Sequence, residues 1–305
     1  MNKAGSKKRI AVSVISALLS LMIVALVTYG KDSLSRFLNN VTNPVNKEFD
    51  TSQDFVRFLD VGQGDSILIY SNGRSMLLDT STSDYGNEIC AQLNSCGIKN
   101  IDVLMLSHLH TDHTGSVQRI CDDYGIKNLV LPELSVYSEG MSAAQYAINA
   151  VTKSGGGVYN AEQGMNFKVG EFEITVLASY GDFEDENNQS LFVMVGIGGK
   201  RFMFSGDAEA TAEKRILSEG LDLDCDVFKA GHHGSSTSNT KAFLEALSPD
   251  YTVISCGKDN MYGHPHNEVM SRFDKMHITP YRTDLQGDIT FYVDDGKISI
   301  KNSNT

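Results

Sequence analysis

Three histidines and an aspartate stand within six consecutive positions, in the sequence HLHTDH. Imidazole nitrogens and carboxylate oxygens are ligands for zinc and similar divalent cations. The segment follows the apolar run Ile101–Ser107, which is typical of a strand buried on both faces. Alternate residues of an extended chain face the same way, so His108 and His110 can bind one metal, and Asp112 and His113, one turn further on, a second. A surface histidine cluster is the alternative, but three of only eight histidines stand here.

A second apolar run, Arg201–Phe204, ends in Ser-Gly-Asp. Asp207 is therefore placed to bridge two metals, and Gly206 permits a close approach of the backbone. The alternative is that Asp207 caps the helix predicted over Ala208–Ser218, and one side chain can serve both purposes.

The sequence KAGHHGSS (229–236) again carries histidines after a predicted strand. His232 and His233 are candidate ligands for both metals. Ser235 and Ser236 can offer backbone and hydroxyl donors to an anionic substrate. The alternative is a polar loop with ordinary histidines.

A fourth candidate is His264, in the sequence YGHPH (262–266). On a loop rich in glycine and proline it can contact substrate or act as an acid. The alternative is that this segment is only a rigid turn.

Short apolar runs alternate with helical patterns from Phe55 to Lys301, which predicts two mixed sheets with helices outside, an α/β fold. The expected strands are Phe55–Val61, Ser66–Tyr70, Ser75–Leu78, Ile101–Ser107, Phe172–Leu177, Leu191–Ile197, Arg201–Phe204, Asp226–Ala230, Tyr251–Ser255, Ile289–Val293 and Lys297–Ile300. The expected helices are Glu88–Asn94, Ala143–Thr152, Ala208–Ser218, Thr240–Leu247 and Glu268–Met276.

Residues 1–30 have the pattern of a membrane anchor. Four basic residues precede an uncharged apolar run from Ile10 to Tyr29, which at about 20 residues can cross a bilayer. The basic flank predicts a single-pass protein with its body outside the cell, or a secreted one if the segment is cleaved. Residues 31–54 are predicted to be a linker and residues 55–305 the catalytic domain.

The body of the chain is strongly acidic. The net charge is −12, and the first 36 residues carry six basic residues and one acidic residue, so the remainder carries about −17. Such a body repels polyanions at long range, and no Lys/Arg-rich stretch is visible in it. The five cysteines fit no zinc knuckle or disulfide framework and are expected to be core residues.

These motifs together resemble the metallo-β-lactamase superfamily, whose hallmark is HxHxDH followed by a bridging aspartate. Six segments are similar to its ComEC-type branch, the hydrolase domain of DNA-uptake proteins: FLDVGQGDSILI, LSHLHTDHTGS, FSGDAE, KAGHHGSSTS, YGHPH and YRTDLQGDI. The resemblance runs from Phe55 to Val293 and implies an αββα sandwich. The chain differs from ComEC-type proteins in having one candidate membrane span rather than many.

One feature of the superfamily is missing. Its third-motif histidine has no counterpart, since no histidine lies between His113 and His232. The segment Asn187–Ser190 stands in that place, and Asn188 is expected to contact substrate. One member of the His232/His233 pair is expected to take over the ligand role.

The resemblance implies a hydrolase with two divalent cations, zinc first and manganese as the alternative, that hold a hydroxide. Asp112 would ligate and orient the nucleophile, and His264 or the Ser235 region would stabilise the leaving group. Asp60, Asp65 and Asp79 are expected to orient the histidines. The favoured substrate is a phosphodiester such as DNA. The alternative is a phosphoester of the cell envelope such as a phosphorylcholine ester, because phosphorylcholine esterases share the HHG element. No protein partner is inferred.

Overall fold

The computed structural model describes residues 50–133 and 139–304. Its strands are β1 (Phe55–Phe58), β2 (Ile67–Ser71), β3 (Arg74–Leu78), β4 (Asn100–Met105), β5 (Gly125–Leu131), β6 (Gly157–Asn160), β7 (Asn166–Val169), β8 (Phe172–Ala178), β9 (Phe192–Ile197), β10 (Lys200–Phe204), β11 (Val227–Lys229), β12 (Tyr251–Ile254), β13 (Thr279–Arg282), β14 (Ile289–Asp294) and β15 (Lys297–Asn302). Its helices are α2 (Gly86–Ser95), α3 (Thr111–Thr114), α4 (Val117–Asp123), α5 (Met141–Lys153), α6 (Ala210–Ser218), α7 (Lys241–Leu247), α8 (Asn267–Lys275) and α9 (Thr283–Gln286), with short 3-10 turns η1 (Ser83–Tyr85), η2 (Asn187–Gln189) and η3 (Gly231–Gly234).

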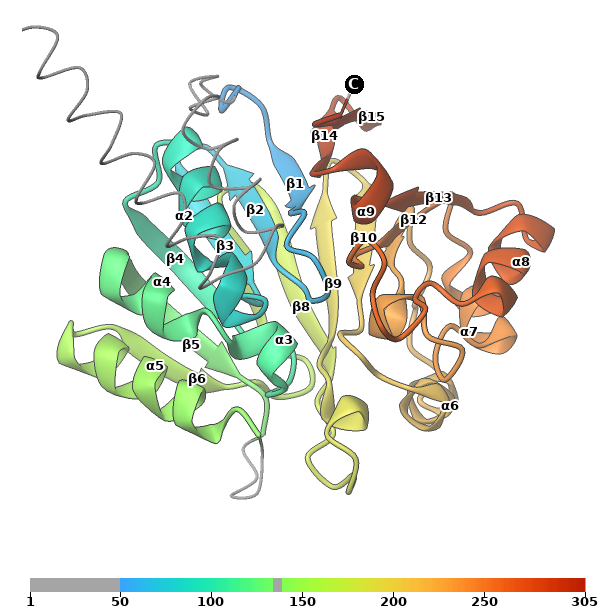
Figure 1. Cartoon of the computed structure of the whole chain (residues 1–305), viewed down its shortest axis with the longest axis horizontal. Helices are drawn as coiled ribbons and strands as arrows, with labels where there is room; N and C mark the ends of the chain where they lie inside the picture. The colour runs from blue at the N-terminus through green and yellow to red at the C-terminus, as the bar shows by residue number, and fades with distance from the viewer. Residues whose placement is uncertain (1–49, 134–138, 305) are drawn as a thin grey trace, which may run out of the picture. The chain divides into compact units, whose positions relative to one another are not determined.

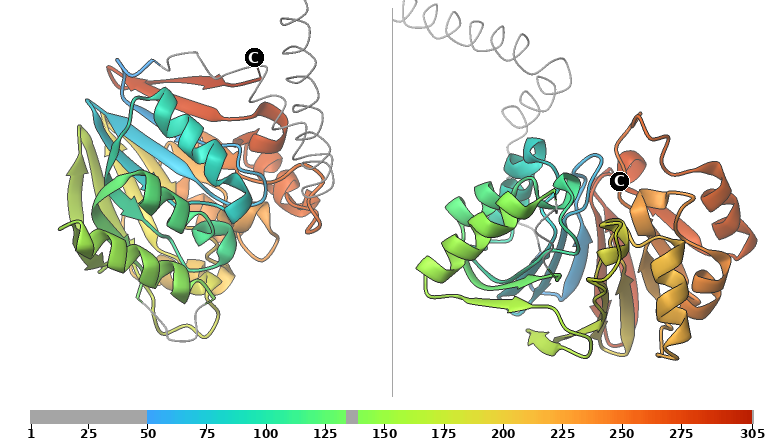
Figure 2. Two further views of the ribbon diagram at one scale, coloured as in Figure 1. Left: turned by 60° about the vertical axis from the view of Figure 1, so that its left-hand side comes forward. Right: turned by 90° about the horizontal axis from the view of Figure 1, so that it is seen from below.

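The described strands form two sheets that face each other (Figures 1 and 2). The first has the order β15-β14-β1-β2-β3-β4-β5-β6 and the second β13-β12-β11-β10-β9-β8-β7. Both are mixed: β3 to β6 pair in parallel and β10 to β13 pair in parallel, while the remaining neighbours are antiparallel. This confirms the α/β sandwich expected from the alternating pattern.

Aromatic side chains fill the space between the sheets. Phe58 of β1 stacks on Phe204 of β10 with ring centroids 5.9 Å apart, and Phe202 meets Phe291 of β14 edge-on at 6.0 Å. All four are at most 2% exposed. Burial of each such side chain contributes on the order of 2–3 kcal/mol, so the two sheets are held as one body.

Helices cover the outer side of each sheet (Figure 1). α2, α4 and α5 pack on the first sheet, and α6, α7 and α8 on the second, each through its apolar face. The five cysteines are free and four are buried, which agrees with their expected place in the core.

Some elements differ from the sequence expectations. The patterns do not predict β5, β6, β7 and β13. β6, β7 and β13 are short and mostly not buried and therefore lack a continuous apolar run, and Lys127 and Asn128 interrupt the apolar run of β5. The helix expected from Ala208 begins at Ala210. The expected membrane helix of residues 1–30 and most of the linker lie outside the described residues. Within residues 50–133 and 139–304, no helix is long and apolar enough to cross a membrane.

Candidate metal centre

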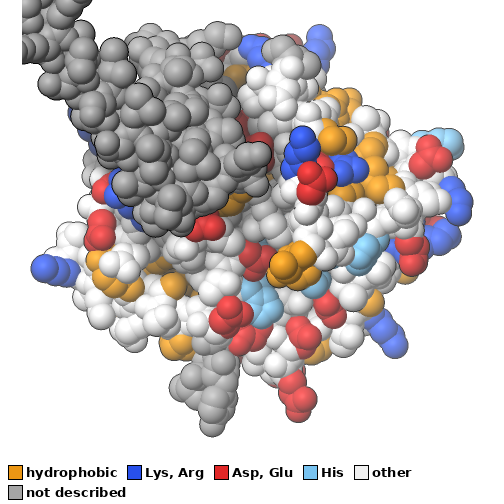
Figure 3. All heavy atoms as spheres, in the orientation of Figure 1, with side chains coloured by type: hydrophobic (Ala, Val, Ile, Leu, Met, Phe, Trp, Pro, Cys, Tyr) orange, Lys and Arg blue, Asp and Glu red, His pale blue; other side chains and the backbone are white. Residues whose placement is uncertain are grey.

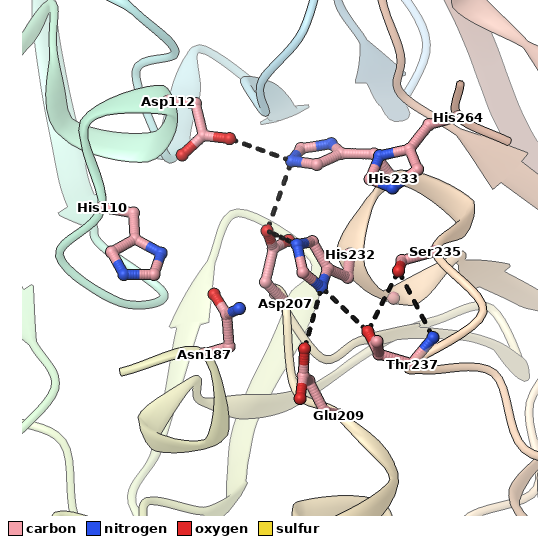
Figure 4. A network of polar contacts seen from close by, with 12 residues as sticks. His110, Asp112, Asn187, Asp207, Glu209, His232, His233, Ser235, Thr237 and His264 are labelled. Carbon is pink, nitrogen blue, oxygen red and sulfur yellow. Dashed lines mark hydrogen bonds and ion pairs between the residues drawn. The ribbon is translucent and has the colours of Figure 1, made fainter. Parts of the chain in front are cut away.

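Strand ends from both sheets bring the candidate residues together. The loop after β4 carries His108, the loop after β10 carries Asp207, and the turn after β11 carries His233. The close-up in Figure 4 shows side chains from these segments directed toward one another. The sandwich therefore joins motifs that lie more than a hundred residues apart in the sequence.

Four ligand-type side chains form one compact group: Asp112, His113, Asp207 and His233. One ligand atom from each lies within 4.8 Å of all the others. Asp207 stands between the two histidines, with Oδ1 3.3 Å from His113 Nε2 and Oδ2 3.3 Å from His233 Nε2. His233 Nε2 is also 3.3 Å from Asp112 Oδ2. Two imidazoles and two carboxylates that converge in this way form a donor set suited to a divalent cation.

Buried atoms without hydrogen-bond partners test whether a cation fits. His108 Nε2, His113 Nε2, His233 Nε2 and Asp207 Oδ1 are inaccessible to solvent and make no hydrogen bond to a described group. Leaving a buried polar atom unpaired costs about 1–3 kcal/mol, and such atoms are rare in native proteins. All four are ligand atoms, so the residues fit a bound divalent cation.

The remaining ring nitrogens are held by the protein. His113 Nδ1 is 2.8 Å from Asp79 Oδ2, and Asp79 itself accepts from Ser107 N and Oγ at 2.7 Å each. His233 Nδ1 donates to the carbonyl of Ser255 at 2.9 Å. Because Nδ1 is bound by the protein in both rings, Nε2 is the nitrogen that a cation can take.

The histidine pair occupies an unusual turn. His232 and His233 both have left-handed backbone conformations, with φ of +49° and +53°, which cost roughly 1–2 kcal/mol per residue outside glycine. Asn239 holds the turn: its Oδ1 accepts from Gly231 N at 2.9 Å and its Nδ2 donates to the Gly231 carbonyl at 2.9 Å. Strain held by surrounding bonds is typical of functional sites.

The model of the Metallo-beta-lactamase superfamily matches residues 59–258. The chain belongs to this superfamily. It is 29% identical over 260 residues to ComE operon protein 3 of Bacillus subtilis, covering 79% of this chain and 33% of that protein. It is 31% identical over 241 residues to Competence protein ComA of Neisseria gonorrhoeae, covering 78% of this chain and 32% of that protein. The resemblance to ComEC-type proteins is thereby confirmed, and the chain spans about a third of the length of these relatives.

The fold is also similar to that of a solved superfamily structure, the metallo-beta-lactamase fold protein YhfI from Bacillus subtilis. The TM-score is 0.54 at 10% sequence identity, with 81% of this chain and 99% of that chain covered. At this identity the likeness concerns the fold alone.

The buried histidines and carboxylates of this site shift one another's pKa values. Burial alone would lower the pKa of His233, but Asp207 and Asp65 raise it to about 10. Burial would also lower the pKa of His113, but Asp207, Asp79 and Asp112 raise it well above its ordinary value. The histidines in turn hold the pKa of Asp207 well below its usual range despite burial. Asp207 and Asp112, whose pKa values are both lowered, are therefore ionised at neutral pH and attract cations.

His108 and His110 lie beside the four-residue group. The His108 ring is 4.1 Å from that of His113 and 4.8 Å from that of His110, centroid to centroid. His108 is 1% exposed, whereas the His110 side chain is 30% exposed. His232 is also near, with Nε2 3.8 Å from Asp207 Oδ2. The structure thus brings every predicted metal ligand into one region.

The residues predicted to contact substrate, unlike the predicted metal ligands, do not all face the site. His264 stacks near His233, with centroids 6.3 Å apart. Ser235 is buried and its Oγ is 3.0 Å from Thr237 Oγ1, while Ser236 is exposed. Asn188 is buried, and its Oδ1 accepts from Glu209 N and Ala212 N at 3.1 and 3.2 Å. That oxygen caps α6 rather than facing the site.

Asp207 is not the helix cap that its sequence position also suggested. The N-cap of α6 is Glu209, and Asn188 satisfies the first amides. Of the expected orienting carboxylates, Asp79 bonds to His113, and Asp65 Oδ1 is 3.6 Å from His233 Nδ1. Asp60 is exposed.

Sequence reasoning missed Lys229. Its side chain is 1% exposed, and Nζ lies 3.8 Å from Asp207 Oδ1. The signal was present, because a lysine inside the apolar run of β11 is unusual for a buried strand. It missed Asn187 as well, whose Oδ1 is buried and makes no hydrogen bond to a described group.

Proposed function

We propose that this chain is a metal-dependent phosphodiesterase that cleaves DNA. The observation that carries the proposal is the compact group of two imidazoles and two ionised carboxylates with unpaired ligand atoms. The substrate class comes from the resemblance to the ComEC-type branch, and one of the similar proteins is named a competence protein. The N-terminal apolar run supports a location at the cell membrane with this domain outside the cell.

Asp112, His113, Asp207 and His233 would hold a cation directly, with His108 and His110 beside them. Divalent cations bound there supply a nucleophile from water near neutral pH and stabilise charge on the phosphoryl oxygens. The Asp112 side chain is 30% exposed, whereas Asp207 is 2% exposed. Asp112 therefore borders the solvent side, where it can orient the attacking group, and Asp207 anchors the interior.

An aromatic side chain lies at the rim of the site. Tyr262 is 60% exposed and stacks on His264, with centroids 5.6 Å apart and planes at 22°. Next to it, Met261 is 90% exposed. An exposed aromatic ring such as that of Tyr262 can stack an unpaired base, which favours single-stranded over duplex DNA.

Acidic side chains lie close to the histidines. Figure 3 shows exposed histidine and acidic side chains together near the middle of one face. Glu139 and Asp185, on the loops beside the centre, are exposed. Such a rim opposes a long polyanion, so we propose that the substrate enters as a short single strand whose phosphates meet the bound cations.

The same acidic rim favours a second candidate, a phosphorylcholine ester. A quaternary ammonium group is attracted to carboxylates and to the face of an aromatic ring such as Tyr262. The acidic rim and the exposed Tyr262 ring therefore support the cell-envelope alternative.

One experiment separates the two. The full-length chain, loaded with Zn²⁺ or Mn²⁺, is given bis-p-nitrophenyl phosphate, single- and double-stranded DNA, and p-nitrophenyl phosphorylcholine. We expect faster cleavage of single-stranded DNA than duplex, inhibition by chelator, and background rates for Asp207→Ala and His110→Ala with unchanged circular dichroism. Turnover of the phosphorylcholine ester alone overturns the nuclease proposal in favour of the second candidate. Wild-type rates in either variant exclude the proposed centre.

A further inference from the structure

The loop that stands in place of the third-motif histidine carries one buried oxygen without a partner. Asn187, in η2 between β8 and β9, has an Oδ1 that is inaccessible to solvent and makes no hydrogen bond to a described group. Figure 4 shows its side chain pointing into the space between His110 and Asp207. A buried amide oxygen without a donor costs about 1–3 kcal/mol, so its presence calls for a ligand.

This loop is fastened to the loops that carry the other ligands. Ser190 Oγ accepts from Asp207 N at 3.0 Å, and Leu191 N donates to the Ser107 carbonyl at 2.9 Å. Asn188, next in the chain, caps α6 through its Oδ1. The side chains of Asn188 and Ser190 are thus used for structure, whereas the Asn187 side chain points toward the centre in Figure 4.

Two neighbouring histidines, His108 and His110, have no assigned third partner. His108 Nε2 is buried and makes no hydrogen bond to a described group, while its Nδ1 is 3.2 Å from Ser107 Oγ. The ring of His110 lies 4.8 Å from that of His108. Two neighbouring imidazoles are an incomplete set by comparison with catalytic zinc sites, which have three protein ligands and a water.

The histidine pair does not complete that set. His233 Nε2 already belongs to the four-residue group with Asp207. His232 has its Nε2 3.8 Å from Asp207 Oδ2, and Figure 4 shows it on the side of Asp207 opposite His110. These contacts therefore favour a ligand from the loop of Asn187, rather than His232 or His233, in the place of the third-motif histidine.

We infer that Asn187 Oδ1 is the third protein ligand, with His108 and His110, of a second divalent cation beside the Asp112–His113–Asp207–His233 group. The inference rests on the proposed metal centre and adds the residue that completes it. An amide oxygen is a harder donor than imidazole, and oxygen donors suit manganese better than nitrogen donors do. This position therefore selects Mn²⁺ over Zn²⁺ more strongly than a three-histidine site would.

The test measures metal binding directly. The full-length chain is stripped with chelator and titrated with Mn²⁺ or Zn²⁺ by calorimetry, and Mn²⁺ loading is followed by electron paramagnetic resonance. We expect the wild type to bind two ions with the spectrum of two adjacent, exchange-coupled Mn²⁺ ions. Asn187→Ala should keep the first ion and weaken the second by about tenfold or more, with loss of the coupled spectrum. Asn187→His should restore two ions and shift the second-ion preference toward Zn²⁺ by about tenfold.

Glu186→Gln is the matched control. Glu186 Oε2 lies 3.8 Å from His110 Nε2, but both carboxylate oxygens already accept from Glu139 N. It should bind both ions as the wild type does. Two ions of unchanged affinity in Asn187→Ala, or loss of the second ion in Glu186→Gln alone, overturn the inference. A wild-type chain that binds no ion refutes the proposed centre itself, which is a different outcome.

Discussion

Lys229 Nζ lies 2.5 Å from Asp65 Oδ2, and both side chains are 1% exposed. Burial alone would lower the pKa of Lys229, but Asp65 and Asp207 outweigh it and raise that pKa above its usual value. Lys229 therefore keeps a fixed positive charge beneath a centre that also holds Asp79 and Asp112. This charge offsets part of the negative charge of the carboxylates around it.

Removing that charge alone should be costly. Lys229→Met preserves the length of the side chain but leaves Asp65 buried without its partner, which destabilises a protein by about 3–5 kcal/mol. The double variant with Asp65→Asn should recover part of this loss. Urea unfolding of the chelator-treated proteins measures both values, and losses that simply add in the double variant contradict a coupled pair.

Asp79 should tune metal affinity through His113. Its φ of +62° is a left-handed conformation that asparagine also tolerates, so Asp79→Asn should keep the backbone. It leaves one acceptor oxygen where Asp79 has two, so the bond to His113 Nδ1 or the bond from Ser107 N is lost together with the charge. We expect metal affinity to fall by about 10–100-fold in competition with a chelator. Asp102→Asn is the control, because Asp102 pairs with Arg74 and Lys127. An equal loss in the control variant argues for a general structural effect.

The strand ends that carry His108, Asp207 and His233 were predictable from the sequence. Each follows an apolar run, and a glycine or a short polar loop marks where the strand stops. The pairing of strands into two facing sheets follows from the alternation of strand and helix patterns. The grouping of the ligands is therefore a consequence of local patterns plus one rule of architecture.

The side-chain directions within a turn were not predictable. Asn187 and Asn188 have the same chemistry and adjacent positions, yet one amide oxygen caps α6 and the other points to the centre. That difference depends on the 3-10 turn of η2 and its ties to Asp207 and Ser107. Likewise, the partner of Lys229 is Asp65, 164 positions earlier in the chain, and no local periodicity connects them.

Metal affinity should rise with pH through the neutral range. A cation and a proton compete for Nε2 of His233, whose pKa is raised to about 10, and of His113, whose pKa is also raised. Below these pKa values the cation must displace a proton from each ring, so affinity should increase by about tenfold per pH unit for each proton displaced. Dissociation constants for Mn²⁺ from pH 6.5 to 9, with proton release measured in buffers of different ionisation enthalpy, check this. A flat profile contradicts the assignment of these rings as ligands.

His264 should act as a hydrogen-bond donor from its neutral form. Burial, together with the nearby His233, His232 and His266, lowers the pKa of His264 to about 4, so the ring is uncharged above that pH. Gln63 Oε1 accepts from Gly257 N at 3.2 Å, which directs its Nε2 to donate to His264 Nδ1 at 3.3 Å. The ring proton therefore resides on Nε2, where it can stabilise a departing oxygen.

The leaving group then decides how much the histidine matters. His264→Ala should slow cleavage of DNA by about 10²-fold or more, because an alkoxide leaves poorly without a donor. Hydrolysis of bis-p-nitrophenyl phosphate should fall far less, since p-nitrophenolate needs no such help. The wild-type rate should also show no decline near pH 6.5 from deprotonation of His264, because that proton is lost near pH 4. His277→Ala, at an exposed histidine, is the control. An equal fall with both substrates means that His264 acts before the leaving group departs, in binding or in positioning the phosphate.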